Sequence, residues 1–302
     1  MTLEQLRIFV AVAERQHMTA AAASLGLTQS AASAAIAALE SQYDLKLFDR
    51  IGRGIALTEE GRVFLKEAKA VLQRAADAED VLHDLGKLVR GVLRVWASQT
   101  VGTYWLPSRL VEFRKAYPGV TLDCTIGNTE EVAEAVREGA AQLGFIEGEI
   151  SDPHLTAQVV AHDKLLLVIG ASHPWANRKE PIRRNEIAVT TWVLREKGSG
   201  TRAIFDSAVA HHKIDPTTVD ITLELPSNEA VATAVSSGAA ASILSTSVVL
   251  AGLEAGLLFA VPFELPERCF YILTHNNRHL SRSTEAFLDC AKLVPIRDTT
   301  SA

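Results

Sequence analysis

Polar residues stand at the points in residues 91–302 where the sequence pattern changes from strand to helix. Ser98, Gln99 and Thr100 follow a short apolar run, and Asn128 precedes a helical pattern. A helix N-terminus presents backbone N–H groups without partners inside the helix, so hydroxyl, amide and guanidinium groups gathered there favour a small anion. We expect one such site, with these candidates: Ser98, Gln99, Thr100, Asn128, Glu147, Ser199, Thr201, Arg202 and Asn228. Each Ser, Thr or Asn taken alone is also a common helix cap without a ligand role.

Glu147 gives this predicted site a negative group. It follows the apolar run 143–146, and we expect it to face the same cleft. A carboxylate beside a dianion is unfavourable unless the carboxyl is protonated or accepts a hydrogen bond from a protonated ligand. Glu147 would then select an anion that carries a hydrogen. The alternative is a salt bridge from Glu147 to Arg195 or Arg202.

Alternating strands and helices are predicted to bring these residues together. The pattern is typical of an α/β protein with parallel strands, in which ligands bind where strands end and helices begin. The predicted elements are 92–97, 105–117, 120–126, 130–138 and 143–146, then 165–169, 191–194, 201–212, 221–225, 229–237 and 242–244. We expect two lobes with the site between them. Their expected bounds are 91–162 with 269–302 for lobe I and 163–268 for lobe II, joined by chain crossings near 161–163 and 267–270.

Residues 19–57 have the spacing of a winged helix-turn-helix. Small apolar residues mark the inward faces of two short helices, and Gly26 supplies the left-handed residue that ends the first. Thr28 is positioned to cap the second helix. The residues expected on the inward face of that second helix are Ala31, Ala32, Ala35, Ile36 and Leu39.

The N-terminal end of the second helix is the part of this motif that enters the major groove of DNA. The candidates for reading base edges or holding a phosphate there are Thr28, Gln29, Ser30, Ser33 and Ala34. Residues 49–57 look like a glycine-turned wing that would place Arg50 and Arg53 beside a minor groove. Alanine-rich helices joined by glycine turns also occur in helical bundles and protein-docking domains, which is the alternative.

The N-terminal part carries no net positive charge, with 11 Lys or Arg and 12 Asp or Glu through Arg90. DNA affinity must then come from a local patch and from several copies acting together. A helical pattern over residues 58–89 has an apolar stripe that one helix cannot bury by itself, which indicates an antiparallel partner helix in a second subunit. The alternative is packing on the C-terminal part of the same chain. The expected domains are 1–58, 59–90 and 91–302.

Composition and motifs favour a protein that is neither an enzyme nor metal-dependent. A chain of 302 residues with 48% hydrophobic content can form two or three domains with real cores. Cys124, Cys269 and Cys290 are too widely separated for a disulfide framework or zinc site, so we expect buried small apolar residues, with a redox-sensing pair as the alternative. The sequence lacks a nucleophile elbow, a signal-peptide pattern and a membrane-length apolar run, which favours a cytoplasmic protein.

Four segments resemble the LysR-type transcriptional regulators: 3–9, 19–57, 45–50 and 57–61. Length and domain order also agree with this family over the whole chain. The resemblance implies a winged helix-turn-helix domain, a dimerising linker helix and an effector domain with the fold of periplasmic solute-binding proteins. Many family members carry Arg after the serine that matches Ser33, whereas this chain has Ala34. This departure affects how strongly the second helix would bind DNA and which base sequence it would recognise.

Within that family, residues 192–202 resemble the branch that regulates carbon fixation and sulphur assimilation. Ser98 and Thr100 match positions that bind inorganic or carboxylate anions in several members. The resemblance implies an effector such as sulfite, sulfate or a small organic acid, no cofactor, dimers paired into tetramers on promoter DNA, and altered contact with RNA polymerase. The competing hypothesis is a cytoplasmic solute-binding receptor or enzyme of periplasmic-binding-protein fold with a helical appendage.

Overall fold

The computed structural model describes residues 1–51, 54–84, 89–176 and 178–293. The chain divides into two compact units, Met1–Leu85 and Gly86–Ala302. The elements of the first unit are α1 (Leu3–Arg15), α2 (Met18–Ser24), α3 (Gln29–Tyr43), β1 (Phe48–Ile51), β2 (Gly54–Leu57) and α4 (Glu59–Asp84).

The first unit has one core, in which helices α1–α3, strand β1 and helix α4 meet around Phe9. The Phe9 side chain is fully buried, and its ring lies 5.4 Å from that of Phe48 on β1 and 4.8 Å from that of Phe64 on α4. The α1 helix begins at Thr2, where a reciprocal pair of hydrogen bonds with Gln5 satisfies two free backbone N–H groups. One aromatic cluster therefore fixes three parts of the unit.

The turn between α2 and α3 follows the sequence prediction with one exception on α3. Gly26 adopts a φ of +69°, and Thr28 caps α3 by accepting the N–H of Ala31 at 3.2 Å. The buried residues of α3 include Ala32, Ile36 and Leu39. Ala31, predicted to face inward, is exposed, because the inward row on this helix starts one residue later.

The α4 helix packs on α1, yet part of its apolar stripe faces outward. Ala68 is buried in the core of the unit, whereas Val63 and Leu82 are 65% and 69% exposed. The second unit begins beyond this helix, and residues 85–88 at the predicted join lie outside the described residues. The exposed valine and leucine side chains leave an apolar face on a helix 26 residues long.

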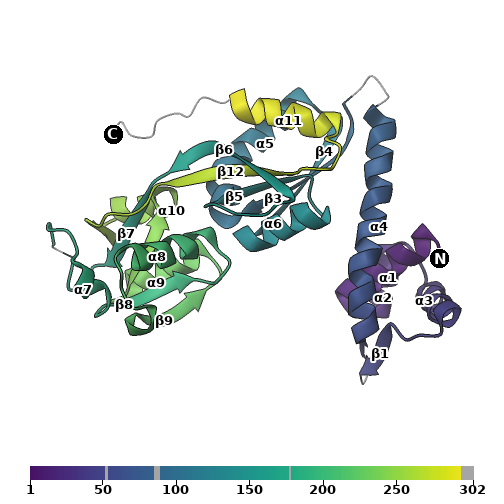
Figure 1. The fold of residues 1–302 in the computed structure, drawn as a ribbon, viewed down its shortest axis with the longest axis horizontal. Coiled ribbons are helices and arrows are strands. Elements are labelled where there is room, and N and C mark those ends of the chain that lie inside the picture. Colours follow the sequence, from purple (N-terminus) through teal and green to yellow (C-terminus); the bar gives the residue numbers. More distant parts are fainter. Residues whose placement is uncertain (52–53, 85–88, 177, 294–302) are drawn as a thin grey trace. The chain divides into compact units, whose positions relative to one another are not determined.

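The second unit contains two five-stranded mixed sheets in two lobes, both visible in Figure 1. In lobe I the strand order is β4-β3-β5-β12-β6, and in lobe II it is β11-β7-β10-β8-β9. The strands of lobe I are β3 (Gly91–Ser98), β4 (Val120–Gly127), β5 (Leu143–Glu147), β6 (Leu155–Asp163) and β12 (Arg268–His275). Those of lobe II are β7 (Leu165–Gly170), β8 (Thr191–Arg195), β9 (Asp220–Leu225), β10 (Ala241–Ser245) and β11 (Leu258–Val261).

Helices cover both faces of each sheet (Figure 1). In lobe I, α5 and α11 lie on one face, where Phe113 and Phe287 pack against Phe145 of the sheet, and α6 lies on the other. In lobe II, α8 packs with one cluster of core residues and α9 and α10 with the other. The helices are α5 (Leu106–Ala116), α6 (Thr129–Glu138), α7 (Arg184–Ile187), α8 (Gly200–His211), α9 (Asn228–Ser237), α10 (Thr246–Glu254) and α11 (Arg282–Leu293).

Parallel strands were predicted, and each sheet has a parallel part and an antiparallel part. Strands β3, β4 and β5 run parallel, as do β8, β9 and β10, whereas β12 is antiparallel to β5 and β6, and β7 is antiparallel to β10 and β11. Strands β6, β11 and β12 had no counterpart among the predicted strands. The antiparallel strands flank the two crossings between lobes, which lie at Lys164 and at residues 262–267.

Candidate functional site

The N-terminal end of α3 presents the predicted base-reading residues on the surface of the first unit. Gln29, Ser30 and Ala34 are exposed, and Ser33 is half-buried. Thr28 is also exposed, but its hydroxyl oxygen already serves as the helix cap and lies 3.1 Å from Ser30 Oγ. The end of the helix thus offers an amide and a hydroxyl beside a positive helix dipole.

The wing is an antiparallel pair in which Phe48 faces Leu57 and Ile51 faces Gly54. Arg50 is exposed on β1, and Arg53 lies outside the described residues together with Gly52.

A residue that the sequence analysis did not single out holds the start of this wing. Glu40, buried on α3, accepts the backbone N–H of Leu47 at 2.8 Å and that of Phe48 at 3.3 Å, and Lys46 Nζ lies 3.2 Å from its other oxygen. The only sequence signal was an acidic residue at an apolar position of the helix.

Several residues of the predicted anion site come together where strand ends of lobe I meet helix starts of lobe II. Ser98, Thr100, Glu147 and Asn228 are each at most 1% exposed. The Glu147 carboxylate accepts from Ser98 Oγ through one oxygen and from Thr100 Oγ1 at 3.1 Å through the other. Asn228 Nδ2 donates across the lobes to Thr100 Oγ1 at 3.0 Å. Four residues from three distant parts of the sequence therefore share one buried hydrogen-bond network.

Burial raises the pKa of the Glu147 carboxyl. The positive charges of Arg268 and Arg195 and the hydrogen bond from Thr100 oppose this rise, and the negative charge of Asp163 adds to it. Within the described residues no arginine lies within salt-bridge distance of Glu147. The alternative of a direct salt bridge to Arg195 or Arg202 is therefore not what the structure shows.

Arg195 is buried and held by acceptors from both lobes. Its guanidinium donates to both oxygens of Glu196 at 2.8 Å, to Gln99 Oε1 at 2.7 Å and to Asn228 Oδ1 at 2.9 Å. Because it donates both to Gln99 of lobe I and to Asn228 at the start of α9, the guanidinium bridges the two lobes.

The start of α8 lies against the same network. Ser199 caps the helix by accepting the N–H of Arg202 at 3.1 Å, and the N–H of Gly200 donates to Thr129 Oγ1 at 3.1 Å. Thr201 Oγ1 accepts from Arg268 Nη1 at 3.0 Å. A Cβ at Gly200 would overlap the backbone of Glu147, so the close approach of this helix to β5 requires glycine.

Two predicted site residues have other roles. The Arg202 guanidinium donates to Asp206 at 3.0 Å and to Glu224 at 2.7 Å, so its charge is directed to acidic groups of lobe II. Asn128 caps α6 by accepting the N–H of Glu131 at 3.0 Å. Thr129 and Arg268 join the network instead. No local sequence pattern marks Arg268 as a site residue, because the second crossing brings it to the site from a distant part of the chain.

Other predictions concern cysteines, metals and membranes. Cys124 is exposed, contrary to the expectation of burial, and Cys269 and Cys290 are half-buried. In the part of the chain that the structure describes, no cluster of three His, Cys, Asp or Glu residues could hold a metal ion. Among the same residues no single helix is long and apolar enough to span a membrane; α2 and α3 reach that length only together, and they are bent by 106° at their turn.

Comparison with known proteins finds two family models along the chain. Residues 3–62 match "Bacterial regulatory helix-turn-helix protein, lysR family", and residues 86–294 match "LysR substrate binding domain". The uncharacterized HTH-type transcriptional regulator YeiE of Escherichia coli K12 is 34% identical over 290 residues, covering 95% of this chain and 96% of that protein.

A second relative and a solved structure agree with these matches. The probable RuBisCO transcriptional regulator of Trichormus variabilis is 34% identical over 292 residues, with 95% of this chain and 86% of that protein covered. The crystal structure of full-length CbnR complexed with its target DNA is similar in fold, with a TM-score of 0.69, 22% identity, and coverage of 97% of this chain and 99% of that one.

Proposed function

Because this chain belongs to the LysR family of bacterial transcriptional regulators, we propose that its second unit binds a small anion between the lobes and thereby changes promoter binding by the first. The family assignment establishes a helix-turn-helix regulator with an effector-binding domain, and it confirms the predicted resemblance and two-lobed α/β architecture. The effector, the base-reading residues and the assembly are our proposal. The named relatives of this chain are transcriptional regulators, which favours a regulator over an enzyme.

The observation that carries the proposal is the convergence of the Ser98 and Thr100 hydroxyls on the buried Glu147 carboxylate. Two hydroxyl donors beside the positive end of the α8 dipole suit an oxyanion. We expect the effector to be sulfite, sulfate or a small carboxylate. The hydroxyls would turn from Glu147 to the oxygens of the bound anion.

Glu147 would then choose among these anions by their protonation. A dianion beside a carboxylate is repelled, whereas an anion that retains a hydrogen can donate it to Glu147. This selection belongs to the ionised form of Glu147, because a protonated carboxyl, which the raised pKa favours, would itself donate to a dianion. We therefore expect hydrogen sulfite to bind more tightly than sulfate.

Anion binding would act on DNA through the arrangement of the lobes. An effector shifts a conformational equilibrium only when it binds the two arrangements with different affinity, and a site whose walls come from both lobes fulfils this condition. The exposed apolar face of α4 would pair with the same face of a second cytoplasmic copy, and dimers would pair into tetramers that bind two promoter half-sites. Contact with RNA polymerase would change with the bend of the DNA.

The test is calorimetric titration of the full-length protein with sulfite, sulfate, thiosulfate, phosphate and acetate. Ser98→Ala and Thr100→Ala should weaken binding of the preferred anion about tenfold each, since each removes a buried donor worth roughly 1–3 kcal/mol. Ser237→Ala, which alters an exposed hydroxyl bonded within α9, is the control. Unchanged affinity in both cleft variants would contradict the site, and Glu147→Gln should reduce the preference for sulfite over sulfate.

A DNA-binding experiment distinguishes the proposed regulator from the competing hypothesis of a solute receptor or enzyme. The regulator should retard a duplex selected from a random-sequence library, with an affinity that falls as salt rises. A receptor or enzyme of similar fold would show no such retardation at any salt concentration.

A further inference from the structure

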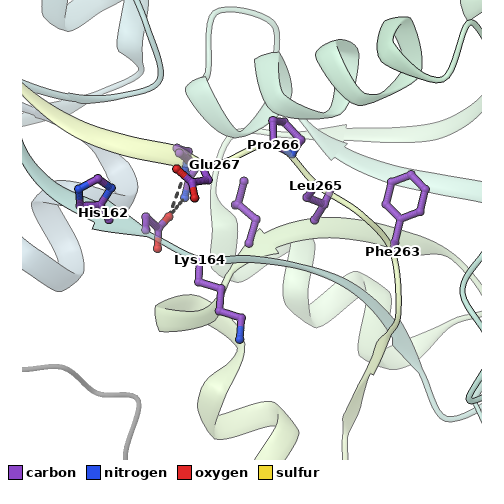
Figure 2. Close-up of a pocket in the computed structure, with 9 residues that line it drawn as sticks. His162, Lys164, Phe263, Leu265, Pro266 and Glu267 are labelled. Atoms are coloured by element: carbon purple, nitrogen blue, oxygen red, sulfur yellow. Dashed lines mark hydrogen bonds and ion pairs between the residues drawn. The ribbon is translucent and has the colours of Figure 1, made fainter.

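A cavity apart from the proposed anion site lies between the two chain crossings that join the lobes. It has a volume of about 410 Å³. Figure 2 shows Lys164 on one crossing and Phe263, Leu265 and Pro266 on the other. The complete lining is His162, Asp163, Lys164, Leu165, Phe263, Leu265, Pro266, Glu267 and Arg268. This volume falls within the usual range of small-molecule pockets.

The lining of this hinge pocket combines one available cation with an apolar wall. Lys164 is exposed, and among the described residues no carboxylate lies within salt-bridge distance of its ammonium group. Leu165, Phe263, Leu265 and Pro266 supply the apolar part. A ligand that suits both features has one negative group and a compact hydrocarbon body.

The other charged groups of the lining leave the Lys164 ammonium as the main group that would attract an anionic ligand. Asp163 is paired with Arg268, whose Nε lies 2.9 Å away, and it also accepts from Ser245 Oγ at 2.7 Å. The side chain of Arg268 is fully buried, so this pair does not compete for a ligand in the open part of the pocket. Glu267 is exposed beside the second crossing and disfavours dianions more than monoanions.

We propose that the hinge pocket is a second ligand site, for a small monocarboxylate with an aromatic or aliphatic body. The carboxylate pairs with Lys164, and the hydrocarbon part packs against Phe263, Leu265 and Pro266. This site is distinct from the proposed anion site, whose hydroxyl and amide groups suit a compact polar ion.

Occupation of the pocket bears on the arrangement of the lobes. Both walls are crossings, so a ligand held between them favours the backbone arrangement in which the walls fit it. Arg268, part of the lining, also donates to Thr201 at the start of α8. The contact from pocket to cleft is therefore direct, and the two ligands should influence each other's affinity reciprocally.

The test uses three probes with the same hydrocarbon body but different charge: phenylacetate, phenylacetamide and phenethylamine. Calorimetry on the full-length protein should show saturable binding of phenylacetate and at least tenfold weaker binding of the neutral amide. Lys164→Gln should weaken phenylacetate binding at least tenfold. Lys164→Glu should reverse the charge preference, so that phenethylamine binds more tightly than phenylacetate. Phe263→Ala should weaken binding of the acid severalfold.

Two variants serve as controls. Lys179→Gln changes an exposed lysine outside the pocket and should bind phenylacetate as the wild type does. Thr100→Ala changes the proposed anion site and should retain saturable phenylacetate binding, with an affinity altered only through the coupling between the two sites. Absence of phenylacetate binding, equal binding of acid and amide, or equal affinity in Lys164→Gln would overturn the proposal. Loss of binding in Thr100→Ala would also overturn it, because the probe would then occupy the cleft.

Discussion

Gln99 of lobe I donates through its side-chain nitrogen to the Glu229 carboxylate of lobe II at 2.6 Å. Tyr104 OH donates to the other oxygen of the same carboxylate at 3.0 Å, and Gln99 Oε1 accepts the backbone N–H of Asn228 at 2.7 Å. Burial and Glu229 raise the pKa of Tyr104 to about 12, so the phenol keeps its proton at neutral pH. Glu229 thus fastens the lobes at the rim of the cleft.

Removal of this fastening should weaken anion binding. Glu229→Ala eliminates two hydrogen bonds between lobes, and the closed arrangement that encloses an anion becomes less populated. Because the carboxylate is exposed, we expect only a three- to tenfold loss of affinity, about 0.5–1.5 kcal/mol, measured by calorimetry. Glu134→Ala, an exposed acid on α6, is the matched control. Equal affinities in the two variants would show that the contact does not favour closure.

The raised pKa of Glu147 predicts a pH dependence of stability. A carboxyl whose pKa is higher in the folded than in the unfolded chain binds more protons when folded, so its contribution is full below the unfolded pKa and is lost as pH rises through the folded pKa. The free energy of unfolding should therefore fall more steeply with pH in the wild type than in Glu147→Gln. The difference in slope cannot exceed about 1.4 kcal/mol per pH unit for one proton.

Urea unfolding of both proteins at several pH values above the ordinary range of glutamate measures this slope. Glu134→Gln supplies the control, because that carboxyl is exposed on α6. Parallel pH profiles for wild type and Glu147→Gln would mean that burial of Glu147 does not control protonation in the folded chain.

Loss of Glu40 should destabilise the first unit and displace the wing. Glu40→Ala leaves the N–H groups of Leu47 and Phe48 without their acceptor, at a cost of roughly 1–3 kcal/mol. Because these residues lead into β1, DNA affinity should fall as well. Glu67→Ala, on an exposed position of α4, should change neither property. Thermal unfolding and gel retardation measure the two effects, and a wild-type melting point in Glu40→Ala would refute the role.

The α3 and wing residues should affect DNA binding in different ways. Gln29→Ala removes a base-reading amide, and discrimination between selected and random duplexes should fall by about 1–3 kcal/mol. Arg50→Ala removes the proposed phosphate contact, so binding should weaken on all duplexes and the logarithmic salt slope should decrease by about one. Ala34→Arg should increase that slope by a similar amount. Fluorescence anisotropy at four salt concentrations separates these outcomes; an identical salt slope in Arg50→Ala would exclude a backbone contact.

The parts of the fold that rest on local patterns were predictable. Gly26 and Thr28 mark the turn before α3 by conformation and capping, and Asn228 marks the start of α9. The antiparallel strands β6 and β12 were harder, because their pairing joins residues more than 100 positions apart, as Arg268 and Asp163 show. Local periodicity carries no information about such partners.

The candidate site shows the same division. Ser98, Thr100 and Glu147 were placed at strand ends from sequence, and their side chains meet in the structure. Arg202 was assigned to the cleft because of its position at a helix start, yet neighbouring acids draw its guanidinium away. A helix start fixes the backbone position, but the direction of a long side chain depends on charges that only the tertiary structure brings near.

The two crossings at Lys164 and 262–267 determine which motions are open to the lobes. Strands β6 and β12 are hydrogen-bonded neighbours up to Asp163 and Arg268, so the crossings leave lobe I side by side. A body tethered at one point can swivel in any direction, whereas a body tethered at two adjacent points turns most easily about the line through them. The lobes are thereby limited to nearly one rotation relative to each other. A ligand bound at any point between them would therefore drive the same rotation.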